Sequence, residues 1–179
     1  MIKWRINNKS IFFENISAFL IALNGLPALF NKNYVSSIEP NDGINLEGIG
    51  SSKNMFNRLE LIKLMNTNLK TIPKITLILS QQLVISCYEI VKDKNDGSPE
   101  FEFFRHLRNG CAHNNKFNFA TSKKANKLTK VPSKPAKWRN FKITRSLNGK
   151  KVIFGFIAPG DILEFLCEMS ERFTHPTRR

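Results

Sequence analysis

The chain has 179 residues and a mass of 20.6 kDa, and a chain of this length buries about 70% of the surface that it exposes when unfolded. A hydrophobic share of 41% excludes a disordered chain, and no run reaches the roughly 18 apolar residues that a membrane-spanning helix needs. Lysines and arginines number 28 against 14 acidic residues, a formal net charge of +14 that favours an anionic partner. The three cysteines (Cys87, Cys111 and Cys167) form no C-x-x-C pair, so we expect a reduced, cytoplasmic protein without a disulfide framework.

The first part of the chain predicts one helix and one long loop. Ser10 can cap a helix that runs to about Leu23 with apolar residues at helical spacing, and Asn24-Gly25 is expected to end it. The stretch Asn33–Ser52 is rich in glycine and contains Pro40, which favours a loop.

Three more helices are predicted over residues 54–70, 73–92 and 99–114. The helix from Pro73 to Lys92 is apolar on most sides, which predicts a place at the centre of a bundle. The next helix has Ser98 as its cap, Pro99 at its first position and acidic residues in its first turn.

Twelve basic residues and no acidic residue lie between Lys116 and Lys151. A basic block beside a nearly neutral remainder favours a nucleic-acid partner, although a solvated loop kept soluble by lysines explains it more simply. Two strands at 141–145 and 151–156 flank Asn148-Gly149, a strong two-residue hairpin signal. The pairs expected to face each other across this hairpin are Ile143 with Phe154 and Phe141 with Phe156.

A last helix is predicted over Pro159–Phe173. The fold class is therefore an all-α helical bundle with a small β-hairpin inserted before the last helix. We expect a single domain over residues 1–179. Its parts are an N-terminal helix and loop (1–54), core helices (55–115), a basic loop and hairpin (116–157) and a C-terminal helix (158–179).

The fourth helix carries the residues best suited to chemistry. Arg108 and His113 stand there with four residues between them, and Asn109 directly follows the arginine. This pattern resembles the R-x4–6-H signature of HEPN domains, small helical bundles that include many metal-independent endoribonucleases. The hairpin and the Ala158-Pro159-Gly160-Asp161 stretch also look like plasmid- and phage-defence-associated members, and the resemblance covers about residues 55 to 173.

The resemblance implies attack of a ribose 2′-OH on the adjacent phosphate, which leaves a 2′,3′-cyclic phosphate. His113 would act as general base or acid, and Arg108 would neutralise charge on the phosphate. Asn109 would orient the phosphate or His113. On a continuous helix five residues advance by about 500°, so Arg108 and His113 would project about 140° apart. The family's solution is a homodimer with a composite active site, and the small Gly110 and Ala112 would allow two helices to approach closely.

Further residues near the motif are candidates for substrate binding. Arg105 shares a face with Asn109, and His106 lies at nearly the azimuth of His113, although a surface role is at least as expected for both. Asn114 and Lys116 follow as a helix exit that would contact RNA or simply cap the helix. Lysines that would attract RNA without reading its bases follow: Lys123, Lys124, Lys127, Lys130, Lys134 and Lys137.

Other side chains are expected to be structural. Trp138 and Phe141 would pack in the hairpin rather than stack on bases, and Cys111 would pack in the core or an interface. A zinc site built from His106, Cys111 and His113 lacks a fourth ligand, so no metal and no cofactor are predicted.

The resemblance thus implies an endoribonuclease that cuts tRNA, rRNA or mRNA, as a toxin with an antitoxin partner or as an anti-phage defence effector, and we expect no membrane partner. An alternative is a non-catalytic HEPN module that dimerises and binds RNA, a nucleotide or a protein. A third is a basic scaffold that binds DNA and RNA equally.

Overall fold

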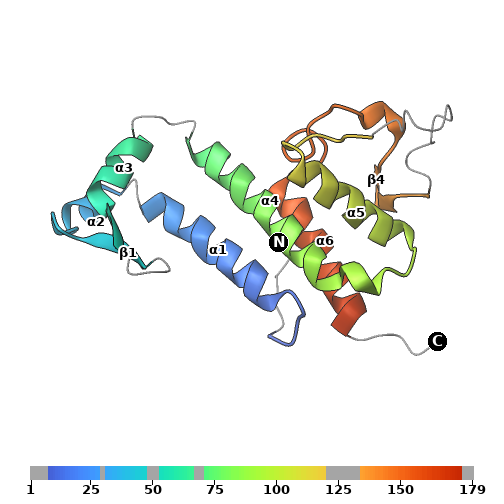
Figure 1. Ribbon diagram of the computed structural model, residues 1–179, viewed down its shortest axis with the longest axis horizontal. Coiled ribbons are helices and arrows are strands. Elements are labelled where there is room, and N and C mark those ends of the chain that lie inside the picture. Colours follow the sequence, from blue (N-terminus) through green and yellow to red (C-terminus); the bar gives the residue numbers. More distant parts are fainter. Residues whose placement is uncertain (1–7, 29–30, 48–52, 67–70, 120–133, 175–179) are drawn as a thin grey trace. The chain divides into compact units, whose positions relative to one another are not determined.

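The computed structural model describes residues 8–28, 31–47, 53–66, 71–119 and 134–174. This part of the chain is mostly helical and carries a small antiparallel hairpin before its last helix, which confirms the predicted fold class (Figure 1). The chain forms two compact units, one of residues 1–19 and 77–179 and one of residues 20–76. The expectation of a single domain stays a prediction.

Helix α1 (Phe13–Ala28) begins in the larger unit and ends in the smaller one. It continues through Gly25 and contains Pro27, so the predicted end at Asn24-Gly25 is wrong. Gly25 does not adopt the left-handed conformation of a helix end, and a glycine in a helix costs only about 1 kcal/mol relative to alanine.

The smaller unit contains structure where the sequence predicted a loop. Helix α2 (Lys32–Ser36) is capped by the side chain of Asn31, and β1 (Gly43–Glu47) pairs antiparallel with β2 (Lys53–Asn57). Helix α3 (Arg58–Asn66) therefore begins four residues later than predicted. The reason is that pairing with β1 fixes Lys53–Asn57 as a strand, and the local helical periodicity does not detect such a partner.

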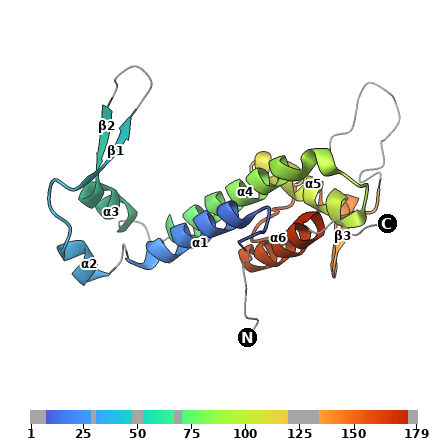
Figure 2. The same cartoon turned by 90° about the horizontal axis from the view of Figure 1, so that it is seen from below.

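The larger unit contains α4 (Thr71–Val91) from Leu77 onward, α5 (Pro99–Ala112) and α6 (Pro159–Thr174), and these helices lie alongside one another in both views (Figures 1 and 2). A short 3-10 helix, η1 (Lys92–Lys94), follows α4. By length and composition alone, the segment Thr71–Lys94 is sufficient to cross a membrane, a property that core helices of bundles share.

Helix α5, not α4, is the central helix of the larger unit. Phe103 and Phe104 are neighbours in sequence and both fully buried, so α5 is covered on two faces. Their rings both meet the ring of Phe165 in α6, with centroids 5.2 Å apart in each pair. Ile78 and Ile90 of α4, in contrast, are 56% and 42% exposed. The prediction that the helix over residues 73–92 is central is therefore wrong.

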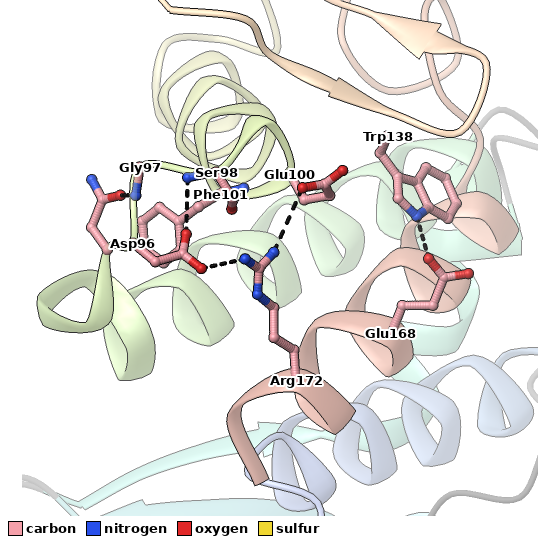
Figure 3. A network of polar contacts seen from close by, with 9 residues as sticks. Asp96, Gly97, Ser98, Glu100, Phe101, Trp138, Glu168 and Arg172 are labelled. Carbon is pink, nitrogen blue, oxygen red and sulfur yellow. Dashed lines mark hydrogen bonds and ion pairs between the residues drawn. The ribbon is translucent and has the colours of Figure 1, made fainter. Parts of the chain in front are cut away.

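The start of α5 confirms the predicted cap. The Ser98 hydroxyl accepts a hydrogen bond from the backbone N–H of Phe101, and Pro99 occupies the first turn. Arg172 of α6 forms ion pairs with Asp96, before the cap, and with Glu100, in the first turn (Figure 3). These contacts fix where α5 begins and how α6 lies against it.

The hairpin forms at a different place from the one predicted. Strand β3 (Lys137–Trp138) pairs with β4 (Phe141–Lys142), and Asn148-Gly149 connects no strand pair. Asn148 has φ −53° and ψ 128° and Gly149 has φ 77°, angles typical of a type II turn. A type II turn splays its flanking strands, whereas two-residue hairpins need type I′ or II′ turns. The prediction of a hairpin at Asn148-Gly149 is therefore wrong.

The predicted cross-strand pairs fail with that turn. Phe154 is 53% exposed with φ 62°, and Ile143 instead donates its backbone N–H to Ala136. The rings of Phe141 and Phe156 do meet, with centroids 5.6 Å apart, but not as strand partners.

Candidate functional site

Arg108 lies on α5 and is held by a carboxylate of α4. Its Nη2 donates to Oε1 of Glu89 at 2.7 Å, and its Nη1 lies 3.4 Å from Oδ1 of Asn109. Lys92 contacts the other oxygen of Glu89 at 3.0 Å. Hydrogen bonds from Lys92 and then from Arg108 hold the pKa of Glu89 below its usual range. Glu89 is therefore ionised near neutral pH and occupies Arg108 as an anionic ligand would.

The Arg108 guanidinium is only partly satisfied. It lies 5.9 Å from the centroid of the Tyr88 ring, and its buried Nε has no hydrogen-bond partner among the described residues. An unpaired buried donor costs about 1–3 kcal/mol. The contact with Glu89 thus leaves the Nε–H donor of Arg108 without a hydrogen bond among the described residues.

His113 stands at the end of α5 rather than within it. The helix ends at Ala112, and His113 is its C-cap with φ −114° and ψ 64°. Its backbone N–H donates to the carbonyls of Asn109 and Gly110, while its side chain is exposed. The 140° separation from Arg108 assumed a continuous helix and does not apply.

The chain reverses direction directly after His113. Asn114 and Asn115 both adopt left-handed conformations, with φ 54° and 58°. The Lys116 backbone N–H then donates to the carbonyls of Gly110 and His113. This turn brings Lys116 back beside the end of α5.

Asn115 anchors the turn. Its buried amide donates to the Ile153 carbonyl at 2.9 Å and accepts from the Ile153 N–H at 2.8 Å, and its own carbonyl accepts from Val152. Sequence reasoning missed Asn115, because its partners are 37 and 38 residues away. The two adjacent asparagines after the motif indicate a turn at this position, since asparagine tolerates the left-handed conformation.

Segment 117–119 is tied to the turn at 148–150. The backbone of Phe117 exchanges hydrogen bonds with Gly149 and Lys150, and Oδ1 of Asn148 accepts from the Phe119 N–H at 2.9 Å. The turn that makes no hairpin thus closes one side of a hollow beside His113.

This His113 hollow has a volume of about 420 Å³. The residues that line it are Ala112, His113, Asn114, Lys116, Phe117, Asn118, Asn148 and Gly149. No carboxylate is among these described residues, so they combine an imidazole, an ammonium and amide groups that suit an anionic ligand. His113, Asn114 and Lys116 thus lie together, and their expected roles in catalysis and substrate binding stay predictions.

The other predicted site residues lie elsewhere. Arg108 and Asn109 do not line the His113 hollow. Arg105 forms an ion pair with the buried Glu102 at 2.6 Å, which is a structural role. His106 is 5% exposed and its ring contacts Phe119, so the expectation that it lies at the surface or beside His113 is wrong.

His106 is electrically neutral in this environment. Burial and the neighbouring Arg105 lower its pKa to about 4, and its Nε2 lies 3.3 Å from Nη2 of Arg105. A neutral buried imidazole suits packing better than phosphate binding.

Gly110 is small for a reason within the chain. A Cβ there would lie 2.4 Å from Cγ2 of Val152. Because this close approach is intramolecular and Gly110 is buried, the expectation that it admits a second helix is wrong. Ala112 is exposed and stays available for that role.

The remaining predictions concern packing, metal and charge. Cys111 is buried, and burial raises the pKa of its thiol to about 12. Among the described residues, no group of three or more metal-ligating side chains lies close enough to hold a metal ion.

Trp138 packs against Phe103 and Phe141, as expected. Its indole N–H donates a hydrogen bond to Glu168 (Figure 3). Lysines of the basic segment that lie outside the described residues are Lys123, Lys124, Lys127 and Lys130.

Comparison of the chain with protein-family models, with curated proteins and with solved structures finds no match. The functional argument therefore depends on the geometry above and on the resemblance of the motif.

Proposed function

We propose that the chain is a metal-independent endoribonuclease of the HEPN type, acting in the cytoplasm as a toxin or anti-phage effector. The observation that carries the proposal is the exposed His113 imidazole in a hollow with Lys116, where no carboxylate is among the described lining residues. An anionic phosphodiester fits such a hollow, and an imidazole can serve as a general base or acid.

The proposed reaction is a transesterification. The ribose 2′-oxygen attacks the adjacent phosphorus as its proton passes to one imidazole, and the 5′-oxygen leaves with a proton from a second acid. The products are a 2′,3′-cyclic phosphate and a 5′-hydroxyl. DNA has no 2′-hydroxyl and would not react.

A homodimer would complete the site. Within one protomer Arg108 is paired with Glu89 of α4 and does not line the His113 hollow. A second protomer would bring its own Arg108 and His113, so that one histidine serves as base and the other as acid. The unpaired Nε of Arg108 and its exposed contact with Glu89 favour exchange of that carboxylate for a phosphate.

The experiment compares cleavage of total RNA and tRNA by the wild type, Arg108→Ala and His113→Ala. We expect both changes to lower cleavage at least 100-fold, in line with removal of an acid–base group or a transition-state donor. Arg58→Ala is a matched control, because Arg58 is 36% exposed and ion-paired with Asp42, much like Arg108 with its 33% exposure. Cutting that persists in both site variants, with all proteins folded, would refute the proposal.

The alternative is a non-catalytic module that binds RNA, a nucleotide or a protein. The separation of Arg108 from the His113 hollow within one protomer favours it. It predicts that wild-type protein binds RNA and leaves it intact.

A further inference from the structure

A second hollow in the larger unit is lined by cations. This hairpin hollow has a volume of about 480 Å³ and lies around β3, β4 and the start of the 3-10 helix η3 (Arg145–Leu147). Its lining residues are Lys134, Pro135, Ala136, Lys137, Lys142, Ile143, Thr144 and Arg145. Four of these eight described residues are basic and none of them is acidic.

The strand register places two of the cations directly opposite each other. Lys137 of β3 is the cross-strand partner of Lys142 in β4. Like charges in this position destabilise a sheet, and neither ammonium has an ion pair among the described residues. A bound anion between them would relieve the repulsion.

Arg139 of the same hairpin shows the contrast. It lies in the two-residue connection and pairs with Glu164 and Glu168 of α6, and it stacks on the ring of Trp138. One cation of the hairpin is thus neutralised to hold the hairpin on the bundle, while Lys137 and Lys142 are left facing the hollow.

Two apolar residues that line the hollow are joined by a backbone hydrogen bond. Ala136 and Ile143 are each 2% exposed, and the Ile143 N–H donates to the Ala136 carbonyl at 2.9 Å. A ligand with anionic groups along one side and an uncharged sugar portion suits this combination.

The two hollows lie at opposite ends of η3. Arg145 at its start lines the hairpin hollow, and Asn148 just after its end lines the His113 hollow. Three residues of 3-10 helix span about 6 Å, so the lining residues Arg145 and Asn148 are separated by a short distance along the chain.

We propose that the hairpin hollow is a docking site for the phosphate backbone of a single RNA strand, which it leads toward the His113 hollow. The backbone phosphates bind Lys137, Lys142 and Arg145, and the sugars lie over Ala136 and Ile143. This inference rests on the proposed function for its substrate class. It does not depend on the identity of the bases, because no base-reading group is required.

The test measures binding of a fluorescent, 2′-O-methylated RNA 12-mer, which cannot be cleaved through its 2′-oxygen, by anisotropy over a series of salt concentrations. Each phosphate contact on a single strand contributes about 0.7 to the slope of log K against log salt. Removing two contacts with Lys137→Gln/Lys142→Gln should lower the slope by about 1.4 and the affinity about 25-fold at 0.1 M salt. The matched control, Lys63→Gln/Lys94→Gln, removes two exposed lysines elsewhere and should change the affinity less than threefold.

Charge reversal gives a second, opposite readout. Lys142→Glu replaces the cross-strand repulsion with an attraction to Lys137, so it should raise the melting temperature slightly while it weakens RNA binding. Equal losses of affinity in the lysine pair and in its control would overturn the docking site and leave only general electrostatic attraction. Unchanged affinity in the Lys137/Lys142 variant would also overturn it and favour a different occupant, such as an acidic protein surface.

The outcomes separate this site from the proposed function. RNA that binds through the hairpin hollow but is never cut by wild-type protein supports the docking site and refutes the ribonuclease. RNA that is cut with unchanged KM by the Lys137/Lys142 variant supports the ribonuclease and refutes the docking site.

Discussion

Asn115→Ala tests how the His113 hollow is held in shape. The change removes both hydrogen bonds between the Asn115 amide and the backbone of Ile153, which are 2.8 and 2.9 Å long. Asn115 and Ile153 are 6% and 0% exposed, so the Ile153 N–H and C=O lose their partner out of reach of water, at about 1–3 kcal/mol for each group. Alanine at φ 58° adds a conformational cost of about 1–2 kcal/mol.

The free energy of unfolding should therefore fall by at least about 3 kcal/mol, the sum of the lower ends of these ranges. A chain of this size loses about 2–4 °C per kcal/mol, so the melting temperature should fall by about 10 °C. Urea denaturation and calorimetry measure both quantities. Since domains have about 5–15 kcal/mol of stability, the variant should still fold at low temperature.

Two controls separate the contributions to this loss. Asn115→Gly also removes the amide but accepts a positive φ, so it should be less destabilised than Asn115→Ala. Asn118→Ala removes an exposed asparagine of the same segment and should stay within about 0.5 kcal/mol of wild type. A loss below 1 kcal/mol in Asn115→Ala would refute the anchoring role.

Gly110→Ala gains about 1 kcal/mol of helix propensity but places a methyl group 2.4 Å from Val152, and such overpacking costs about 1–3 kcal/mol. Urea denaturation should therefore show a lower free energy of unfolding than in the wild type. Equal or higher stability would contradict the contact. Burial lowers the pKa of His106 to about 4 from 6.5, so the unfolded chain takes up this proton first and stability should decline as the pH falls from about 6.5 to 4. An NMR titration of the His106 ring with its midpoint near 6.5 would show that reasoning to be mistaken. Because burial raises the pKa of Cys111 to about 12 and the half-buried Cys167 is the more accessible thiol, iodoacetamide at pH 8 should label Cys167 first, as peptide mass spectrometry would report.

The helices that define the larger unit were predictable because their signals are local. Ser98 and Pro99 mark the start of α5, and Pro159 marks the start of α6. Burial was less predictable, because α5 has a mixed sequence and is nevertheless covered on two faces, while the more apolar α4 is partly exposed. Position in the bundle depends on which helices cover which, and the composition of one helix does not contain that information.

The candidate site was predictable only in part. His113, Asn114 and Lys116 are neighbours in sequence and lie together. Arg108 and its partner Glu89, in contrast, are 19 residues apart on two different helices, and no local pattern indicates their pairing. The turn at Asn148-Gly149 was recognised as a turn, but its type depends on backbone angles that the residue pair alone does not determine. As a result, the sequence predicts a hairpin at a turn that in the structure lines the His113 hollow.

The most direct test of the central claim is an analysis of RNA product ends. Wild-type protein is incubated with tRNA in EDTA, the fragments are examined by mass spectrometry, and the cleaved position is then replaced by a single 2′-deoxynucleotide. The proposed reaction predicts fragments with a 2′,3′-cyclic phosphate and a 5′-hydroxyl, and no cut at the 2′-deoxy position. Intact tRNA, or fragments that end in a 5′-phosphate and a free 3′-hydroxyl, would contradict it.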